Sequence, residues 1–217
     1  MVEDIQSLAG KVVSAFGNHD GRTAFTVAVS GIDGAGKGYI TLQLQKALEK
    51  KGYKIANINT DPWQNPIAVR LQKENAAANV YENIFRWNDF FEQLILPLKV
   101  NKSIYLPTSG ILSDADIYYP LTYNYSDVDI ILIDGILLLK KEYLVHYDYK
   151  VWIECSFETG LRRAIKRNIE KLDVKRLIHD YETFYYAAQS LHFEIDDPKK
   201  AADVLYNNDL EPALSSS

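Results

Sequence analysis

A glycine-rich heptapeptide follows an apolar run near the start of the chain, and this junction constrains the fold most strongly. Residues 31–37 read Gly-Ile-Asp-Gly-Ala-Gly-Lys, and they come directly after the apolar run 24–29. The spacing G-x-x-x-x-G-K between a strand and a helix is typical of a loop that wraps nucleotide phosphates. Its glycines let the backbone approach a polyanion closely, while successive N–H groups and the helix N-terminus present positive partial charge.

The loop defines the residues that we expect to bind ATP. They are Gly31, Asp33, Gly34, Ala35, Gly36, Lys37, Gly38 and Tyr39. Lys37 adds a full positive charge on the side of the β- and γ-phosphates. Gly38 departs from the pattern, because a Ser or Thr hydroxyl normally reaches Mg²⁺ from this position. The sequence therefore predicts ATP binding. Because the hydroxyl is absent at Gly38, we expect carboxylates elsewhere in the chain to coordinate the metal.

Composition narrows the class of protein. The 217 residues are 47% hydrophobic, which is enough for a sizeable core and is most simply explained by one domain over 1–217. A net charge of −5 without a basic block argues against nucleic acid as a partner. The acidic start and the lack of any apolar run near the roughly 18 residues of a membrane span favour a cytoplasmic protein.

The single cysteine, Cys155, excludes an intramolecular disulfide and is expected to be a buried thiol.

Strand-like and helix-like patterns alternate along the chain, which predicts a doubly wound α/β fold of the P-loop NTPase type, with a mostly parallel sheet and helices on both faces. An N-terminal helix is expected within 1–22. The expected strands span 23–30, 53–59, 103–106, 129–135, 149–155 and 202–206, and the other expected helices span 37–51, 80–98, 157–172 and 174–192. Residues 107–127 are expected to be irregular or a hairpin, which could form an acceptor pocket.

Two carboxylates follow predicted strands and are the candidate metal ligands. Asp134 ends an apolar strand, so it should emerge at the carboxyl edge of the sheet, where α/β folds bind ligands. It could hold Mg²⁺ or simply cap the next segment. Asp61 follows the second strand, where it could accept the proton of an acceptor hydroxyl, bind Mg²⁺, or belong to an Asp-Pro turn.

A basic helix over 157–172 supplies the candidate phosphate-gripping arginines. Arg163 and Arg167 are four residues apart and share one helix face, as Arg162 and Lys166 share another. One pair could close over a triphosphate and stabilise the charge of the transition state. The alternative is a solvated face neutralised by neighbouring glutamates.

Aromatic side chains near Asp61 and in residues 118–125 are candidate walls of an acceptor pocket. The candidates are Asp61, Trp63, Arg86, Tyr119 and Tyr123. Tyrosines can stack on a base or hydrogen-bond a sugar. A hairpin with cross-strand tyrosine pairs, and core packing of the tryptophans, are the alternatives.

These motifs together resemble the uridine kinase-like P-loop kinases, a group that includes pantothenate kinase, phosphoribulokinase and nicotinamide riboside kinase. The likeness runs from about residue 24 to 208, through the segments 30–37, 84–89, 133–137, 161–168 and 202–208 together with Asp61. It implies that Asp61 acts as the base and touches the acceptor, and that Arg163 and Arg167 grip the phosphates. Gly38, Asn168 (where the group usually has Asp) and residues 107–126 depart from the pattern of the group.

We therefore expect an ATP- and Mg²⁺-dependent kinase that phosphorylates a hydroxyl of a nucleoside or a similar small molecule. The Gly-Ile-Asp-Gly loop also resembles thymidylate kinase, so a nucleoside monophosphate kinase is an alternative, which would need Arg70 or Arg86 close to Asp61. A nucleotide-binding regulatory module is the alternative that Gly38 favours.

Overall fold

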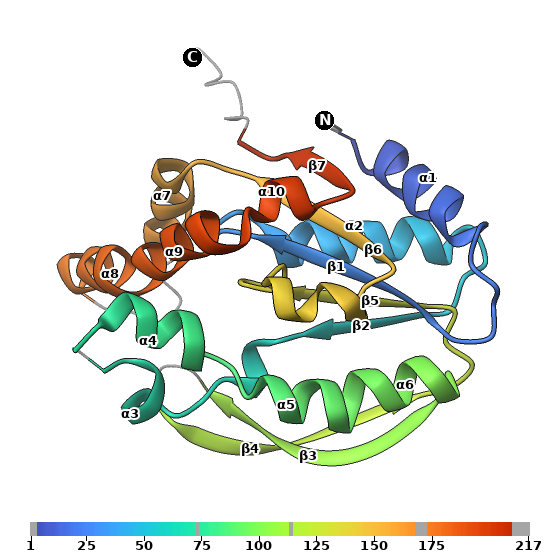
Figure 1. Cartoon of the computed structure of the whole chain (residues 1–217), viewed down its shortest axis with the longest axis horizontal. Helices are drawn as coiled ribbons and strands as arrows, with labels where there is room; N and C mark the ends of the chain where they lie inside the picture. Colours follow the sequence, from blue (N-terminus) through green and yellow to red (C-terminus); the bar gives the residue numbers. More distant parts are fainter. Residues whose placement is uncertain (1–3, 73, 113–114, 168–172, 210–217) are drawn as a thin grey trace.

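A parallel five-stranded sheet forms the centre of the molecule (Figure 1). The computed structural model describes residues 4–72, 74–112, 115–167 and 173–209. The strands of this sheet are β1 (Phe25–Gly31), β2 (Ile55–Asn59), β5 (Ile130–Gly135), β6 (Tyr149–Glu154) and β7 (Val204–Asn207). They lie in the order β2-β5-β1-β6-β7, and every pairing is parallel. This arrangement confirms the expected doubly wound α/β fold.

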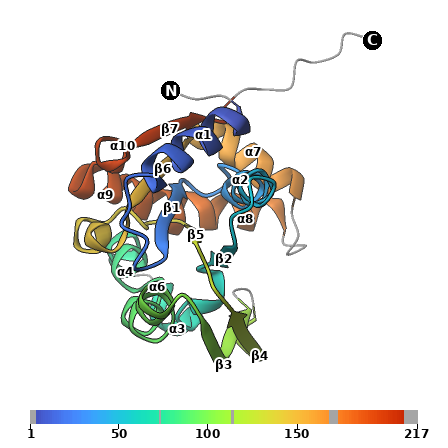
Figure 2. The same ribbon diagram turned by 90° about the vertical axis from the view of Figure 1, so that its right-hand side faces the viewer.

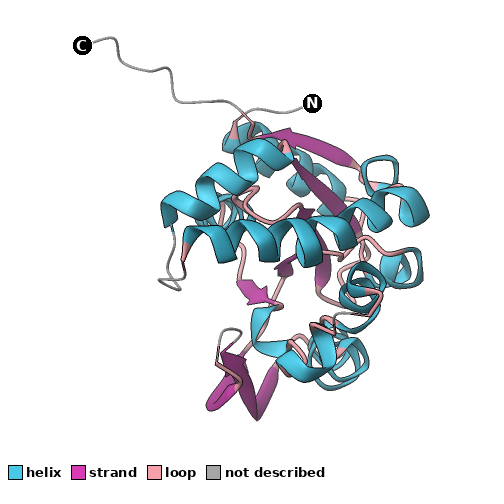
Figure 3. Ribbon diagram, turned by 90° about the vertical axis from the view of Figure 1, so that its left-hand side faces the viewer, coloured by secondary structure: helices cyan, strands magenta, loops and turns pink. Residues whose placement is uncertain are grey.

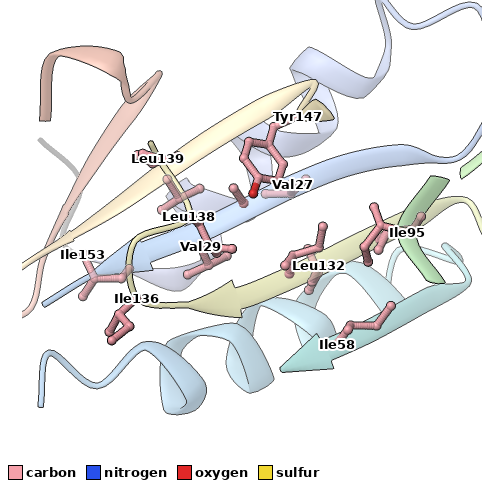
Figure 4. Packing of buried hydrophobic residues seen from close by; sticks show 14 of the residues in the cluster. Val27, Val29, Ile58, Ile95, Leu132, Ile136, Leu138, Leu139, Tyr147 and Ile153 are labelled. Atoms are coloured by element: carbon pink, nitrogen blue, oxygen red, sulfur yellow. The ribbon is translucent and has the colours of Figure 1, made fainter. Parts of the chain in front are cut away.

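The apolar runs form the middle of the sheet. Every residue of β1 and of β5 is buried, as expected for strands covered on both faces, whereas β2 at the edge alternates. Figure 4 shows the apolar side chains of these strands packed with those of the segment after β5. The register sets Asp134 beside Val29 on one side and Asn59 on the other, so the ends of three strands meet at one edge.

Helices flank both sides of the sheet (Figure 2). The N-terminal helix α1 (Ile5–Phe16) packs on α2 (Lys37–Glu49), and α2 contacts β1, β2 and β5. Asp4 caps α1 by accepting a hydrogen bond from the Ser7 N–H at 2.8 Å. Within the described parts of the chain, no helix has the length and apolar character required for a membrane span.

The long helix expected over 80–98 is wrong as a continuous element, because the chain leaves the helix at residues 84–86. The observed elements are α4 (Ala76–Asn83), α5 (Trp87–Asp89), a π-helical segment (Phe90–Ile95) and α6 (Leu96–Asn101). Between α4 and α5, Phe85 forms a β-bridge with Gln64, and the Arg86 N–H donates to the Trp63 carbonyl at 2.8 Å. The segment after β2 therefore forms hydrogen bonds with backbone groups that would bond within the helix if the helix were continuous.

A separate antiparallel hairpin lies at the bottom of Figure 1, formed by β3 (Ile104–Leu112) and β4 (Ile117–Tyr125). The hairpin alternative is thus confirmed for this region, and the strand expected over 103–106 is present but continues to residue 112 as β3. The hairpin packs on the 3₁₀ helix η1 (Asp61–Trp63). Two further short helices are α3 (Ile67–Arg70), between η1 and α4, and the 3₁₀ helix η3 (Lys141–His146), between β5 and β6.

Helical elements between β6 and β7 cover one end of the sheet (Figure 3). Helix α7 (Phe157–Arg167) matches the expected basic helix, although residues 168–172, including Asn168, lie outside the described residues. Helix α8 (Val174–Asp180) continues through a π-helical turn, η4 (Tyr181–Tyr185), into α9 (Tyr186–Asp196), so the helix expected over 174–192 runs four residues further. The short α10 (Pro198–Ala201) leads into β7.

Candidate functional site

A cavity of about 410 Å³ opens where the phosphate-loop pattern and the carboxyl ends of β2 and β5 meet. Its wall contains the loop residues Asp33, Gly34, Gly36, Lys37, Gly38 and Tyr39. Of the residues expected to bind ATP, only Gly31 and Ala35 do not line it, because both are buried beneath the loop. The cavity also contains Asp61, Asp134, Arg163 and Arg167. The fold thus brings the four separately predicted chemical groups into one space.

The loop has the backbone conformation that its glycines allow. Gly34 and Gly36 have φ angles of +77° and +87°, and Gly36 is the N-cap of α2. Two groups expected to face phosphate already have partners inside the loop. The Gly34 N–H donates to Asp33 Oδ1 at 2.8 Å, and Lys37 Nζ donates to the Ile32 carbonyl at 2.9 Å. A phosphate would have to replace these contacts.

Residues from distant parts of the chain hold the loop in place, and sequence reasoning missed them. Gln189 of α9 is buried, and its Oε1 accepts from the Asp33 N–H at 2.8 Å. Asn208, just after β7, donates from Nδ2 to the Ala35 carbonyl at 2.7 Å. Neither residue carries a local motif for such a role, because both contacts depend on the complete fold.

Helix α7 brings its arginines over the loop. Arg163 and Arg167 line the cavity, whereas Arg162 donates to Thr159 Oγ1 at 3.3 Å on its own helix. The Arg163 guanidinium also donates to the Asn208 carbonyl at 2.7 Å, so the same residue contacts both this arginine and the loop. Of the two predicted pairs, the pair 163/167 is therefore the one that faces the cavity.

Cys155 is a buried thiol, as expected, and it contacts the arginine just described. Its Sγ lies 3.5 Å from Arg163 Nη1, and the residue is 7% exposed. Burial raises the pKa of the Cys155 thiol to about 11, although the nearby Arg163 charge opposes this rise. The sulfur therefore stays protonated at neutral pH and acts as a packing group.

Asp134 is a buried carboxylate at the junction of β5 and the cavity. Its Oδ2 accepts from Asn59 Nδ2 at 3.1 Å, and the residue is 5% exposed. Burial raises the pKa of Asp134, while the Asn59 hydrogen bond and the Lys37 charge oppose the rise. A Cβ built on Gly38 would lie 3.7 Å from Asp134 Oδ2, so the position of the missing hydroxyl faces this carboxylate.

Asp61 begins η1 and keeps contact with solvent while lining the cavity. Its pKa is raised to about 6, first because neighbouring protein atoms desolvate the carboxylate, and next because the Asp33 charge repels it. Lys37 opposes the rise, and Asp134 adds to it. A carboxylate that titrates near this pH suits a group that accepts a proton.

The donor set of the cavity fits a hard divalent cation. Mg²⁺ is usually held by one or two carboxylates together with waters and substrate phosphates, rather than by a complete protein cage. Asp134 and Asp61 provide two carboxylates beside the phosphate loop, and burial, the first cause of the raised pKa of each, disfavours their charged forms. A cation bound there would stabilise those charged forms.

Two of the aromatic residues expected in an acceptor pocket, Trp63 and Tyr123, belong to the core instead. Trp63 and Tyr123 are 2% and 8% exposed, and Trp63 Nε1 donates to the Tyr123 hydroxyl at 2.9 Å. The Arg86 guanidinium lies over the Trp63 ring at 5.3 Å, and the Tyr119 ring occupies the space above Gly110. None of the expected contacts Trp63, Arg86, Tyr119 and Tyr123 lines the cavity.

Residues that were not predicted also line the cavity. They include Gln64, Ile84, Ile136, Leu177, Asp180, Tyr181 and Tyr185. Gln64 had a signal in the sequence, because it follows Asp61 by three residues and therefore shares its face of a 3₁₀ turn. The two tyrosines had none, since a π-helical turn changes which side chains of that helix face the cavity.

Comparisons with known proteins support the fold. The chain matches no protein-family model and no curated protein. Among solved structures, it is similar to a possible uridine kinase from Bacillus stearothermophilus, with 22% identity, a TM-score of 0.72 and coverage of 93% of this chain and 96% of the other. It is also similar to a candidate fructose transport system kinase from Silicibacter sp. TM1040 (18% identity, TM-score 0.72, coverage 94% and 98%). D-glycerate 3-kinase from Cryptococcus neoformans is a third similar structure (12% identity, TM-score 0.66, coverage 94% and 95%). The chain therefore has the α/β fold of the P-loop kinases.

Proposed function

We propose that this protein is an ATP- and Mg²⁺-dependent kinase that transfers the γ-phosphoryl group to a hydroxyl of a small molecule, such as a nucleoside or a related metabolite. The observation that carries the proposal is the position of Asp61. Its carboxylate shares one cavity with Lys37 of the phosphate loop, and the two charges influence each other. A phosphate cradle and a proton acceptor side by side are what transfer to a hydroxyl requires.

In this proposal each part of the cavity has a separate task. The phosphate loop and Lys37 hold the triphosphate, and Arg163 and Arg167 approach it from α7. Asp134 and Asp61 would hold Mg²⁺, which supplies positive charge to the phosphate oxygens when bound. Asp61 orients the acceptor hydroxyl and takes its proton. Catalysis then rests on positioning and charge stabilisation, without a covalent intermediate on the protein.

The alternative of a nucleoside monophosphate kinase has less support. Such an enzyme needs a cation close to Asp61 for the phosphate of its acceptor. Arg70 is 1% exposed and donates to the Asn65 carbonyl at 2.9 Å and to the Tyr185 hydroxyl at 3.3 Å. Neither Arg70 nor Arg86 lines the cavity.

A regulatory module that binds nucleotide without turnover is the alternative of another class, and Gly38 favours it. The proposal and this alternative differ in one measurement. ATP consumption is measured with a panel of nucleosides and small alcohols, with Mg²⁺ and after its removal by a chelator. Mg²⁺-dependent turnover of one acceptor supports the kinase, whereas tight ATP binding without any acceptor turnover supports the module.

Substitution of the loop lysine tests the ATP site itself. Lys37→Ala is expected to remove most of the affinity for ATP, because the charge on the β- and γ-phosphates is lost. Lys46→Ala serves as the matched control, since Lys46 is an exposed residue of the same helix outside the cavity. ATP binding that is unchanged in Lys37→Ala would reject the ATP site.

A further inference from the structure

Asn59, the last residue of β2, contacts both candidate carboxylate residues through its side-chain amide. Its Nδ2 donates to Asp134 Oδ2 at 3.1 Å, and its Oδ1 accepts from the backbone N–H of Asp61 at 2.7 Å. All three residues line the cavity. An ionised carboxylate only accepts and a backbone N–H only donates, so these two partners allow one orientation of the amide. One side chain therefore joins the positions of the two carboxylates.

The strand register explains the contact with Asp134. Asn59 of β2 pairs with Asp134 of β5, so the two side chains leave neighbouring parallel strands at the same level and on the same face. The backbones of these strand ends are joined without the amide, because the Thr60 N–H donates to the Asp134 carbonyl at 3.0 Å. Removal of the Asn59 amide should therefore leave the strand ends in place and release the Asp134 carboxylate.

The contact with Asp61 turns the chain out of β2. An Asn oxygen that accepts from the N–H two residues later forms an Asx turn, which mimics a backbone turn. Here the turn leads into η1, and Asp61 is the first residue of that helix. Among the described residues, the Asp61 carboxylate accepts one hydrogen bond, from Gln64 Nε2 at the long distance of 3.5 Å. Its direction therefore depends mainly on its own backbone, which Asn59 holds.

We propose that Asn59 is a positioning residue for phosphoryl transfer: its Nδ2 orients Asp134 for Mg²⁺, and its Oδ1 places Asp61 for the acceptor hydroxyl. Hydrogen-bonded neighbours of a metal ligand typically contribute about 10–100-fold to metal affinity or activity. A displacement of about 1 Å at a reacting group costs on the order of 100-fold in rate. This inference deepens the proposed kinase function and rests on it for the roles of the two carboxylates.

Two substitutions separate the two contacts. Asn59→Ala removes both. Asn59→Ser keeps an oxygen that can accept from the Asp61 N–H in a similar turn, but it lacks the amide that reaches Asp134. Asn57→Ala is the matched control, because Asn57 lies on the same face of β2 two residues earlier and donates to Gln45 Oε1 at 2.8 Å outside the cavity. The milder Asn59→Ser keeps the test decisive if Asn59→Ala does not fold.

Calorimetry measures the contact with Asp134 without any turnover. The Kd of a non-hydrolysable ATP analogue is determined for each full-length variant with excess Mg²⁺ and with a chelator, and the ratio of the two values gives the contribution of the metal. We expect this contribution to fall about tenfold in both Asn59→Ala and Asn59→Ser and to stay unchanged in Asn57→Ala. A metal contribution that is equal in the wild type and in both Asn59 variants would overturn the role toward Asp134.

The amide proton of Asp61 measures the second contact in the unliganded protein. A hydrogen bond to Asn59 Oδ1 slows the exchange of this proton with solvent. By NMR of the full chain, we expect exchange about 3–10-fold faster in Asn59→Ala, since one hydrogen bond is lost. Asn59→Ser and Asn57→Ala should stay near the wild-type rate. Equal exchange in the wild type and Asn59→Ala would overturn the role toward Asp61.

Kinetics separates a positioning role from a purely structural one. At saturating Mg²⁺ and ATP, kcat should fall about 10–100-fold in Asn59→Ala and less in Asn59→Ser, which keeps the turn. A lower melting temperature of Asn59→Ala, with kcat and the metal contribution unchanged, would identify a structural residue and overturn the inference. If the wild type phosphorylates no acceptor, the kinase function is rejected, while calorimetry and NMR still decide whether Asn59 holds the two carboxylates.

Discussion

Gly34 of the phosphate loop and Gly160 of α7 touch so closely that neither position can accept a side chain. A Cβ built on Gly34 would lie 2.3 Å from the Gly160 carbonyl oxygen, and one on Gly160 would lie 2.7 Å from the Asp33 carbonyl oxygen. Real Cβ atoms do not approach backbone atoms this closely, so a side chain at either position would push the loop and the helix apart. The helix that carries the candidate arginines is thus fixed against the candidate phosphate site by direct backbone contact.

Gly160→Ala should therefore separate α7 from the loop. We expect a loss of about 1–3 kcal/mol in the free energy of unfolding, as for other overpacked sites, together with weaker ATP binding. Gly10→Ala is the matched control, because Gly10 lies in the helix α1 with open space around its Cα. There the substitution should stabilise the protein by about 0.5–1 kcal/mol. Chemical denaturation and calorimetry with ATP measure both effects, and equal behaviour of the two variants would contradict the argument.

Gly38→Ser should restore a hydroxyl next to Asp134. A Cβ at this position meets only Asp134 Oδ2, at an ordinary contact distance of 3.7 Å, so the side chain fits. We expect the Mg²⁺ concentration that gives half-maximal activity to fall about 3–10-fold, since one protein ligand replaces a water. Gly38→Ala adds the same Cβ without the hydroxyl and should leave the Mg²⁺ requirement unchanged. A shift of equal size in both variants would assign the effect to helix propensity instead.

Asp61→Asn should stabilise the unliganded protein while it removes activity. The folded-state pKa of Asp61, about 6, lies above its ordinary value of 3.8, so the folded protein binds this proton more tightly than the unfolded chain does. The wild type therefore loses stability as the pH rises from about 4 to about 7. The variant lacks this loss, and because Asp61 keeps solvent contact we expect a gain on the order of 1 kcal/mol at neutral pH.

Thermal unfolding at several pH values measures this effect. The melting temperature of Asp61→Asn should exceed that of the wild type by about 2–4 °C at neutral pH, and the difference should vanish below about pH 4. Glu92→Gln makes the same change of charge at an exposed site and should show no such difference. The activity of the wild type should fall as the pH drops through about 6, because the protonated carboxyl no longer accepts the acceptor proton.

Gln189→Met should separate stability from ATP affinity. The substitution removes the acceptor of the Asp33 N–H, but it also removes the Nε2 group, which is buried without a hydrogen-bond partner among the described residues. The two effects offset each other, so we expect a stability change within about 1 kcal/mol. The loop, however, loses a contact that fixes its position, and the KM for ATP should rise several-fold with little change in kcat. Gln93→Met at an exposed site is the control, and a fall in kcat alone would contradict this positioning role.

The sequence was sufficient for the parts of the structure that depend on local pattern. The loop over 31–37 and the buried strands β1 and β5 follow from glycine spacing and apolar runs. Because parallel strands end at one edge, the meeting of Asp134 with the loop could also be anticipated. Helix periodicity left two faces of the basic helix open, and the resemblance to the P-loop kinases selected Arg163 and Arg167, which line the cavity.

The sequence-based predictions fail where segments that are distant in sequence contact each other. The helix expected through 80–98 breaks because Gln64 pairs with Phe85, a contact between segments that no local periodicity reveals. Trp63 and Tyr123 satisfy each other's polar atoms, which removes both from the site. The contact of Gln189 with Asp33 joins residues 156 positions apart, so only the folded chain identifies it.

The internal hydrogen bonds of the phosphate loop reduce the free energy that a ligand gains on binding there. Asp33 Oδ1 and the Ile32 carbonyl already accept hydrogen bonds from the Gly34 N–H and from Lys37. Binding is therefore an exchange of partners, and its net gain is the difference between new and old contacts. We expect a single inorganic phosphate to gain little from that exchange, whereas a triphosphate could replace several contacts at once. The loop should therefore favour ligands by the number of phosphates that bind together, before any recognition of the base.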